Sequence, residues 1–292
     1  MRILACLNSE LMPVEEAKVS VWDRGFLFAD SIYEVFRLHG GRCWLETEHV
    51  DRLRRSLEAL EFPEVDVEAL MERVRRTVEA SEVEEGTVYI QMTRGVAPRL
   101  HAFPNPPVPP TELIIVRPYD DTATALLRES GVKVISHPDL RWGRCDVKST
   151  NLLANVIANE AAHRAGAYEA VLYTDDEFVT EATHSSLLWY RHGVLQGTPE
   201  GPEILPGTTR ILALRLAEAI GVRFEECRVT LEELSQASEV MLLGTTIEVL
   251  SVIAIDDKRI REGRPGPIAS RLQIAYHEAV RKWLDTEPLT PG

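Results

Sequence analysis

The chain has 292 residues, of which 45% are hydrophobic and 27% charged, a composition typical of a globular protein rather than a disordered or fibrous one. Its length favours two domains over one. The formal net charge of −14 disfavours nucleic acid and anionic membrane surfaces as partners, because both are themselves negative. An anionic ligand would therefore need a locally basic site.

The first part of the chain has the pattern of an antiparallel sheet with helices. Apolar alternation predicts strands, and apolar residues at helical spacing predict helices. The expected strands are 3–7, 31–38, 42–45, 87–93 and 112–116, and the expected helices are 46–60 and 67–80. The proline-rich segment 104–110 cannot donate a ladder of hydrogen bonds, so we expect a loop there.

The pattern changes after a short polar stretch near residue 120. The strands expected beyond it are 132–137, 169–173, 185–190, 240–243 and 249–255, and the helices are 151–165, 208–220 and 267–284. The sequence therefore predicts an α+β chain of two domains. We expect a small N-terminal α/β domain over 1–119, a linker over 120–125 and a larger C-terminal domain over 126–292.

Cysteine spacing and apolar runs bear on the compartment. The four cysteines are scattered and lack a Cys-x-x-Cys pair, which favours reduced thiols and a cytoplasmic protein. The longest apolar stretches, such as 247–255, are too short to span a bilayer, and the N-terminal apolar run is too short for a signal peptide. We therefore expect no membrane association.

Two side chains have the chemistry of a covalent amine site. Lys148 precedes an apolar helical run, where a partly desolvated ammonium gives up its proton more readily and becomes a nucleophile. Glu181 follows a short strand and precedes small hydroxyl residues, so its carboxylate could hold a cationic ring nitrogen. Taken singly, each is better explained as an ordinary exposed residue, at a helix start or in a turn.

Two further segments could bind an anion. Residues 205–210 open a helix, whose free amides and dipole favour phosphate, and residues 243–246 end a strand with similar groups. Arg52 could add a formal positive charge. Arg99 and His101 lie two residues apart in a loop and could clamp a carboxylate, since the guanidinium fork matches its two oxygens. Taken alone, helix capping and turn chemistry explain the 205–210 and 243–246 segments somewhat better, and an ordinary polar loop explains Arg99 and His101 equally well.

The order of these segments resembles that of the fold-type IV pyridoxal-phosphate aminotransferases, most closely the D-amino acid (D-alanine) aminotransferases. The resemblance runs from about Asp23 to Ala279. The segments that carry it are Asp23-Arg24-Gly25, Tyr33-Glu34-Val35, Glu48–Leu53, Thr93-Arg94-Gly95, Pro98–His101, Arg144–Ser149, Asn151-Leu152-Leu153, Val179-Thr180-Glu181, Gly207–Arg210 and Gly244-Thr245-Thr246. It implies a smaller N-terminal sheet-plus-helices domain and a larger C-terminal pseudo-barrel domain that binds pyridoxal 5′-phosphate.

The resemblance also implies a role for each matching residue. Lys148 looks like the lysine that forms the internal aldimine and moves the proton at Cα, and Glu181 looks like the partner of the pyridine nitrogen. The residues that match the rest of the cofactor site are Arg52, Leu205, Thr208, Thr209 and Thr245. The residues that match the substrate site are Tyr33, Arg99, His101 and Thr246.

The activity that the resemblance implies is ping-pong transamination between D-amino acids, such as D-alanine or D-glutamate, and 2-oxo acids. In the D-amino acid enzymes the Arg-x-His pair reaches in from the neighbouring subunit, so a homodimer with shared active sites is expected. This pair is generally missing from the L-branched-chain aminotransferases of the same fold. Its presence as Arg99 and His101 favours D-specificity.

The sequence departs from the family pattern after Glu181, and alternatives stay open. Ser186 stands where the D-enzymes usually have asparagine, and His184 replaces a small residue, adding a titratable group. Thr208 stands where isoleucine is common. The enzyme alternatives are an L-branched-chain aminotransferase and a 4-amino-4-deoxychorismate lyase on the same scaffold. A non-catalytic anion-binding module is disfavoured, because it needs neither Lys148 nor Glu181.

Overall fold

A computed structural model describes residues 3–286 and divides the chain into two compact units. The first comprises Met1–Asp120 and Val147–Asn151, and the second comprises Asp121–Asp146 and Leu152–Gly292. Both contain helices and sheet, which confirms the α+β class. The expected linker over 120–125 differs from the structure, since a helix begins at Thr122. The segment around Lys148 groups with the first unit although most of its neighbours in sequence belong to the second.

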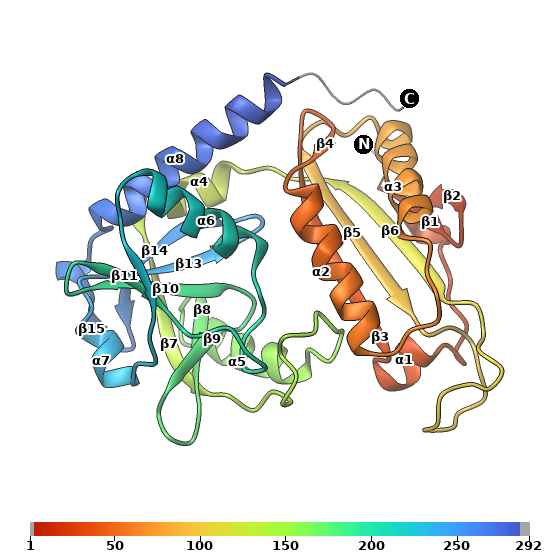
Figure 1. The fold of residues 1–292 in the computed structure, drawn as a ribbon, viewed down its shortest axis with the longest axis horizontal. Helices are drawn as coiled ribbons and strands as arrows, with labels where there is room; N and C mark the ends of the chain where they lie inside the picture. The colour runs from red at the N-terminus through yellow and green to blue at the C-terminus, as the bar shows by residue number, and fades with distance from the viewer. Residues whose placement is uncertain (1–2, 287–292) are drawn as a thin grey trace. The chain divides into compact units, whose positions relative to one another are not determined.

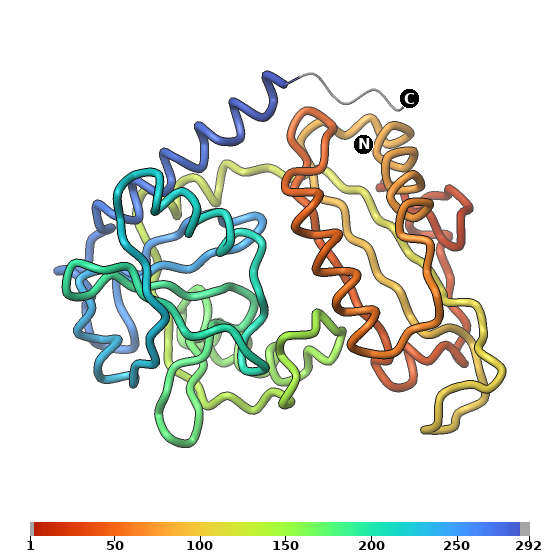
Figure 2. Tube along the Cα trace, viewed as in Figure 1, coloured from red at the N-terminus to blue at the C-terminus, as the bar shows by residue number. Residues whose placement is uncertain are grey.

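The first unit is built on an antiparallel sheet with the strand order β2-β1-β6-β5-β3-β4 (Figure 1). Its strands are β1 (Leu4–Leu7), β2 (Glu10–Pro13), β3 (Ser31–His39), β4 (Arg42–Cys43), β5 (Gly86–Thr93) and β6 (Thr111–Pro118), and its helices are α1 (Arg24–Phe28), α2 (Glu46–Ala59) and α3 (Val67–Ser81), with a short 3₁₀ turn at Val14–Glu16. Figure 2 shows the segment between β5 and β6 as a long loop, which includes the proline-rich stretch.

Helices α2 and α3 share one hydrophobic core with the sheet. Leu53 and Leu57 of α2 and Leu70 and Val74 of α3 pack with alternate residues of β3, β5 and β6. This follows from the strand period of two, which turns every second side chain toward the helices. The Asp66 side chain accepts a hydrogen bond from the first turn of α3 and so sets where that helix begins.

The second unit is built on a larger mixed sheet with the strand order β12-β11-β10-β13-β14-β7-β8-β9, and β15 pairs with β14. Its strands are β7 (Val132–Pro138), β8 (Glu169–Tyr173), β9 (Val179–Ala182), β10 (Ser186–Arg191), β11 (Val194–Gly197), β12 (Phe224–Glu226), β13 (Glu239–Gly244), β14 (Glu248–Ile255) and β15 (Lys258–Arg259). Its helices are α4 (Thr122–Ser130), α5 (Leu153–Arg164), α6 (Thr208–Ala219), α7 (Leu231–Ser235) and α8 (Pro267–Leu284), with a 3₁₀ turn at Arg261–Gly263.

This sheet is curled. Strands β9 and β10 are far apart in the strand order, yet only the short turn 183–185 joins them. The sheet therefore bends round as a half-barrel. One hydrophobic core includes residues of α7, and another lies beneath α6 and α8, where Ala213, Ala217 and Leu272 are fully buried. The helices found in residues 3–286 include none that is both long and apolar enough to cross a membrane.

Candidate active site

The Lys148 segment is held along β3 by main-chain bonds. The Lys148 carbonyl accepts a 3.0 Å hydrogen bond from the Tyr33 amide, and the Thr150 amide donates to the Ser31 carbonyl at 3.1 Å. The Lys148 amide donates to the Ser56 hydroxyl of α2 at 3.2 Å. These bonds fix the lysine backbone on both sides, so the freedom left to Lys148 is that of its side chain.

The Lys148 ammonium lies over an aromatic ring. Its Nζ is 4.3 Å from the centroid of Tyr33, a cation–π contact, and Tyr33 stacks on Tyr89 at 5.8 Å between centroids. Burial raises the pKa of Tyr89 to about 12. The Tyr89 hydroxyl therefore stays neutral and donates to Gln91 at 2.8 Å. The structure thus brings together two residues of the predicted site, Lys148 and Tyr33.

Arg52 lies in a buried network with Glu34 and His49. Its Nε and Nη2 donate to the two oxygens of the fully buried Glu34 carboxylate at 2.7 and 2.8 Å. His49 Nδ1 lies 2.7 Å from the same carboxylate. Glu34 shares a face of β3 with Ile32 and Phe36, the face that α2 covers, and His49 and Arg52 are one helical turn apart.

The charge states of Glu34 and His49 are set by their burial and by the charged groups beside them. Burial alone would raise the pKa of Glu34, but Arg52 and His49 outweigh it and hold that pKa far below its usual range. Burial lowers the pKa of His49 against the pull of Glu34, so the imidazole is neutral near pH 7. The carboxylate and guanidinium are therefore a permanent ion pair that fixes where Arg52 points.

Arg99 and His101 lie together on an exposed loop, at the ring of Phe28. The Arg99 guanidinium is 5.2 Å from the Phe28 centroid, and the His101 ring is 5.5 Å from it. Arg24 anchors the loop by donating to the carbonyls of Leu100 and Ala102 at 2.7 and 3.2 Å. The ring contacts of this pair are thus with Phe28, whereas the ring contact of Lys148 is with Tyr33.

In the second unit, Glu181 is buried on β9 and receives donors from two sides. The Arg141 guanidinium donates to one carboxylate oxygen, and the Leu205 amide lies 3.2 Å from both. Burial raises the pKa of Glu181 above its ordinary value, although Arg141 and the Leu205 amide oppose the shift. Leu205, predicted as a cofactor contact, thus touches the carboxylate through its main chain.

Arg141 is shared between two carboxylates. Its Nε and Nη2 donate to Asp139 at 2.9 and 2.7 Å, and Nη2 also donates to the Glu203 carbonyl at 2.9 Å. The Thr180 hydroxyl donates to Asp139 at 2.7 Å. Burial tends to lower the pKa of Arg141, but Asp139 and Glu181 raise it further above its usual range. Arg141 is therefore a fixed positive charge that orients Glu181 on β9.

The start of α6 is suited to an anion. Thr208 and Thr209 are buried in its first turn, its N-cap residue is Gly207, which has no side chain to cap it, and that turn contains no acidic residue. A Cβ on Gly207 would collide with the Ser186 hydroxyl, so only glycine lets this hydroxyl approach the helix start. Free helix-start amides and the positive end of the helix dipole bind phosphate.

The turn with Thr245 and Thr246 joins β13 to β14. Strand pairing places it near the start of β10, because Ser186 pairs with Leu243 and Gly244 pairs with Glu248. A Cβ on Gly244 would lie 3.8 Å from the Ser185 hydroxyl. The α6 start and this turn therefore both lie close to the 185–186 segment.

His184, a departure from the family pattern, lies on a turn that a buried carboxylate organises. Glu169, fully buried on β8, accepts bonds from the amides of His184 and Ser185 at 2.6 and 3.0 Å and from the Ser185 hydroxyl at 2.8 Å. The His184 side chain is half exposed, 3.5 Å from Glu169. The turn between Glu181 and Ser186 is thus fixed by Glu169 rather than by His184.

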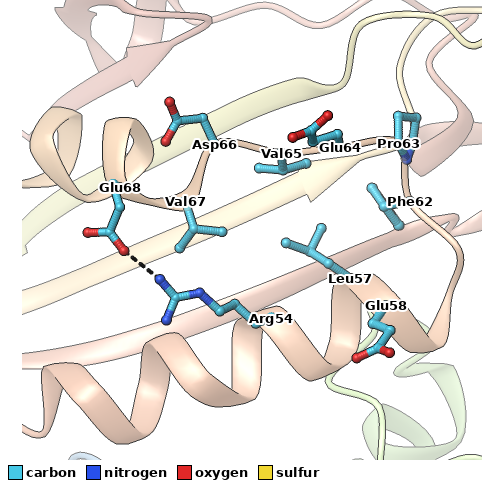
Figure 3. Close-up of a pocket in the computed structure, with 10 residues that line it drawn as sticks. All are labelled: Arg54, Leu57, Glu58, Phe62, Pro63, Glu64, Val65, Asp66, Val67 and Glu68. Atoms are coloured by element: carbon cyan, nitrogen blue, oxygen red, sulfur yellow. Dashed lines mark hydrogen bonds and ion pairs between the residues drawn. The ribbon is translucent and has the colours of Figure 1, made fainter.

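A groove of about 730 Å³ on the first unit is a poor candidate site. It lies between α2 and the segment leading into α3, over an apolar floor of Leu57, Phe62 and Val67 (Figure 3). Acidic side chains surround the groove. Arg54 also lines it, and its guanidinium is paired with Glu68. The predicted site residues are not among those that line it in the described chain.

Comparison with known proteins places the chain in a family. The amino-transferase class IV family model matches residues 31–255. A D-alanine aminotransferase of Staphylococcus aureus (strain N315) is 39% identical over 94% of this chain and 96% of its own length. One from Bacillus licheniformis is 36% identical over 94% of this chain and 95% of its own length.

Solved structures show the same fold. A branched-chain amino acid aminotransferase from T.th., with pyridoxamine 5′-phosphate, superposes with a TM-score of 0.86 at 28% identity, covering 96% of this chain and 94% of its own. The branched-chain enzyme of Escherichia coli gives a TM-score of 0.84 at 24% identity, covering 95% and 94%. The fold is thus that of the fold-type IV enzymes, and the chain belongs to the class IV aminotransferases, which use pyridoxal 5′-phosphate.

Proposed function

We propose that this protein transfers amino groups between D-amino acids, of the D-alanine and D-glutamate type, and 2-oxo acids, in a ping-pong reaction with pyridoxal 5′-phosphate. The observation that carries the proposal is the full-length similarity to D-alanine aminotransferases. The Arg99-x-His101 pair, which distinguishes the D-enzymes in the resemblance described above, supports it. The roles below apply that resemblance to the geometry of each unit.

The second unit fits the phosphate of this cofactor. The start of α6, the Ser186 hydroxyl that approaches it at Gly207 and the Thr245 turn together offer main-chain amides and hydroxyls with no acidic side chain in the helix turn. We assign Thr208, Thr209 and Thr245 to the phosphate. Arg52 of the first unit would supply the formal positive charge, held in direction by Glu34.

Lys148 and Glu181 would do the proton chemistry. When bound, the cofactor supplies a carbonyl carbon that takes up the amino group and a ring that accepts the electrons of the Cα–H bond. The Lys148 amine, on a backbone held by Ser56 and Tyr33, would accept the proton from the substrate Cα and return it during the transfer of the amino group. Glu181, oriented by Arg141, would face the ring nitrogen and keep it protonated.

The substrate carboxylate would be bound by Tyr33, Arg99, His101 and Thr246. Arg99 and His101 lie on an exposed loop among apolar side chains that are more than half exposed, namely Trp22, Phe26, Leu100 and Phe103. A second copy of this chain, covering these apolar residues, would bring the pair to its partner's active site. We therefore propose a homodimer.

Chirality follows from the side on which the carboxylate is held. Lys148 moves its proton on one face, so the position of the carboxylate clamp selects the hand of the amino acid. The second candidate is L-branched-chain transamination, favoured by the TM-scores with enzymes of that activity. We propose a cytoplasmic location, which the four unpaired cysteines support.

Paired substrates test the proposal. Purified protein with added cofactor is incubated with D-alanine or L-leucine, each with 2-oxoglutarate, and the oxo-acid product is measured. We expect pyruvate from D-alanine and at most a few per cent of that rate with L-leucine. A Lys148→Ala variant should lose turnover while keeping its circular dichroism. Preference for L-leucine, or undiminished turnover by Lys148→Ala, contradicts the proposal.

A further inference from the structure

The turn with Thr245 and Thr246 is tied to helices α8 and α4 by one buried carboxylate. Glu248, the first residue of β14, has only 8% of its side chain exposed. Gln273 Nε2 of α8 donates to its Oε2, and His277 Nε2 of α8 lies 2.8 Å from the same oxygen. Arg128 Nε of α4 lies 3.6 Å away. The turn therefore ends on a residue held by two helices.

Gln273 holds the main chain as well as the carboxylate. Its Oε1 accepts from the Val249 amide at 3.1 Å while its Nε2 donates to Glu248. Both donor and acceptor of one side-chain amide thus bind consecutive residues at the end of the turn. Such a two-point contact resists rotation of the strand start better than a single bond.

The backbone at Glu248 shows that the carboxylate contact is retained despite an unfavourable conformation. Glu248 has φ of 60°, in the left-handed region that side chains other than glycine, asparagine and aspartate rarely adopt. It pairs with Gly244 and so closes the turn 245–247. A glycine would suit this backbone but could not reach α8. The observed glutamate combines the turn geometry with the tie to the helix.

We propose that Glu248 and Gln273 are positioning residues, which fix the Thr245–Thr246 turn against α8 so that its amides and hydroxyls are in place before cofactor and substrate arrive. This rests on the proposed function, which assigns Thr245 to the phosphate and Thr246 to the substrate. In the proposed function, neither Glu248 nor Gln273 touches the reacting atoms. They act through the turn. By holding it in place beforehand, they reduce the conformational entropy that is lost when the cofactor and substrate bind.

The test measures cofactor affinity of the cofactor-free protein, by titration followed in absorbance, and the ³¹P chemical shift of the bound phosphate. Gln273→Leu removes both hydrogen bonds of the amide, and we expect the Kd for pyridoxal 5′-phosphate to rise roughly tenfold. The ³¹P resonance should shift or broaden. The KM for D-alanine should rise, while kcat of the fully loaded enzyme changes by less than about threefold.

Glu248→Gly separates the carboxylate from the backbone strain, since glycine accepts the φ of 60°. If the tie to α8 positions the turn, this variant should also weaken cofactor binding. If the backbone conformation alone does so, its Kd should equal that of the wild type. This variant also keeps the proposal testable should Gln273→Leu fold poorly.

Glu239→Gln is the matched structural control. Glu239 accepts the Ile268 and Ala269 amides at the start of α8, at 3.0 Å, away from the turn. This variant should lower the melting temperature of the protein but leave the Kd and the ³¹P shift unchanged. An equal effect of Glu239→Gln and Gln273→Leu on cofactor affinity, or no effect of Gln273→Leu, overturns the proposal.

Measurements on the wild type and on Thr245→Val distinguish a failure of the proposed function from a failure of the positioning role. A wild type that neither binds the cofactor nor uses D-alanine refutes the proposed function itself. A wild type that does both, with Thr245→Val weakened and Gln273→Leu unaffected, leaves the function standing and refutes only the positioning role.

Discussion

Each unit buries a glutamate against an arginine, but the two pairs are built differently. In the first unit Glu34 receives both arms of the Arg52 fork, and His49 adds a third contact. In the second unit Arg141 directs its bidentate contact to Asp139 and gives Glu181 a single nitrogen. The pKa of Glu34 is accordingly lowered, whereas that of Glu181 is raised by burial.

The difference shows how one pair of residue types serves two purposes. Glu34 has its charge fully matched, so it acts as a permanent counter-ion that orients Arg52. Glu181 is only partly matched, so its carboxylate keeps capacity for another positive group. In the proposed function that group is the protonated ring nitrogen. Burial without full pairing is what makes a carboxylate available for chemistry.

The largest expected effect is the loss of stability when the first pair, Glu34 and Arg52, is broken. Glu34→Leu leaves a buried guanidinium and Arg52→Leu leaves a buried carboxylate, so each should cost about 3–5 kcal/mol of stability. The double variant should cost less than the sum of the two, because it leaves neither charge unpaired. Hydrogen exchange of the β3 amides in the cofactor-free protein reports the stability of this unit.

The control for this prediction lies on the same helix. Arg54 makes an exposed ion pair with Glu68, and Arg54→Ala should cost less than about 1 kcal/mol. Additive costs in the double variant would show that Glu34 and Arg52 do not act as a pair.

The next largest expected effect is a loss of catalytic activity when Glu181, in the second pair, is replaced. Glu181→Gln keeps the shape of the side chain but cannot hold a proton at a ring nitrogen, so we expect kcat/KM for D-alanine to fall roughly 10²–10³-fold. Stability should change little, because the Leu205 amide and Arg141 can still donate to the amide oxygen. Activity within twofold of the wild type would contradict the role given to Glu181.

The smallest effect compares the pH dependence of the two glutamates in the cofactor-free protein. A lowered pKa contributes stability above the ordinary glutamate pKa near 4.3, and that stability is lost as pH falls through the lowered value. A raised pKa works in the opposite sense: stability falls as pH rises from about 4.3 through the raised value. Each pKa unit corresponds to about 1.4 kcal/mol.

The stability difference between Glu34→Gln and the wild type should therefore change below about pH 4.3, and that between Glu181→Gln and the wild type above it, in opposite senses. Relative to the wild type, Glu34→Gln should lose more stability at neutral pH than at about pH 2. Glu181→Gln should gain relative stability as pH rises. Hydrogen exchange at β3 and β9 measures the two units separately, and slopes of the same sign would refute the comparison.

Much of the fold was predictable from periodicity, and the misses have physical reasons. Long, strongly patterned elements such as β3, α2, α3 and α8 lie within a few residues of their expected bounds. The expected strand 42–45 is only β4, Arg42–Cys43, and short elements such as α1, α7 and β12 were missed. A three- to five-residue element has too few positions to show a period, and tertiary pairing decides its conformation.

The candidate site divides in the same way. Lys148, Glu181, Arg52 and the α6 start could be predicted as site residues because their motifs are local in sequence, and these assignments stay predictions. Arg141 precedes the Arg144–Ser149 segment, but nothing local in the sequence assigns it to Glu181, which is forty residues away. Asp139, His49, Glu169 and Gln273 were missed as well, since each bonds a residue distant in the chain.

The sequence by itself determined the acidic net charge, the main helices and strands, and the order of motifs that identifies the family. It determined these because composition, period and motif spacing are properties of neighbouring residues. Only the tertiary structure decided which charges are matched. Two glutamates with the same intrinsic chemistry differ because β3 places Glu34 opposite two partners on α2, whereas the curled sheet leaves Glu181 sharing Arg141 with Asp139.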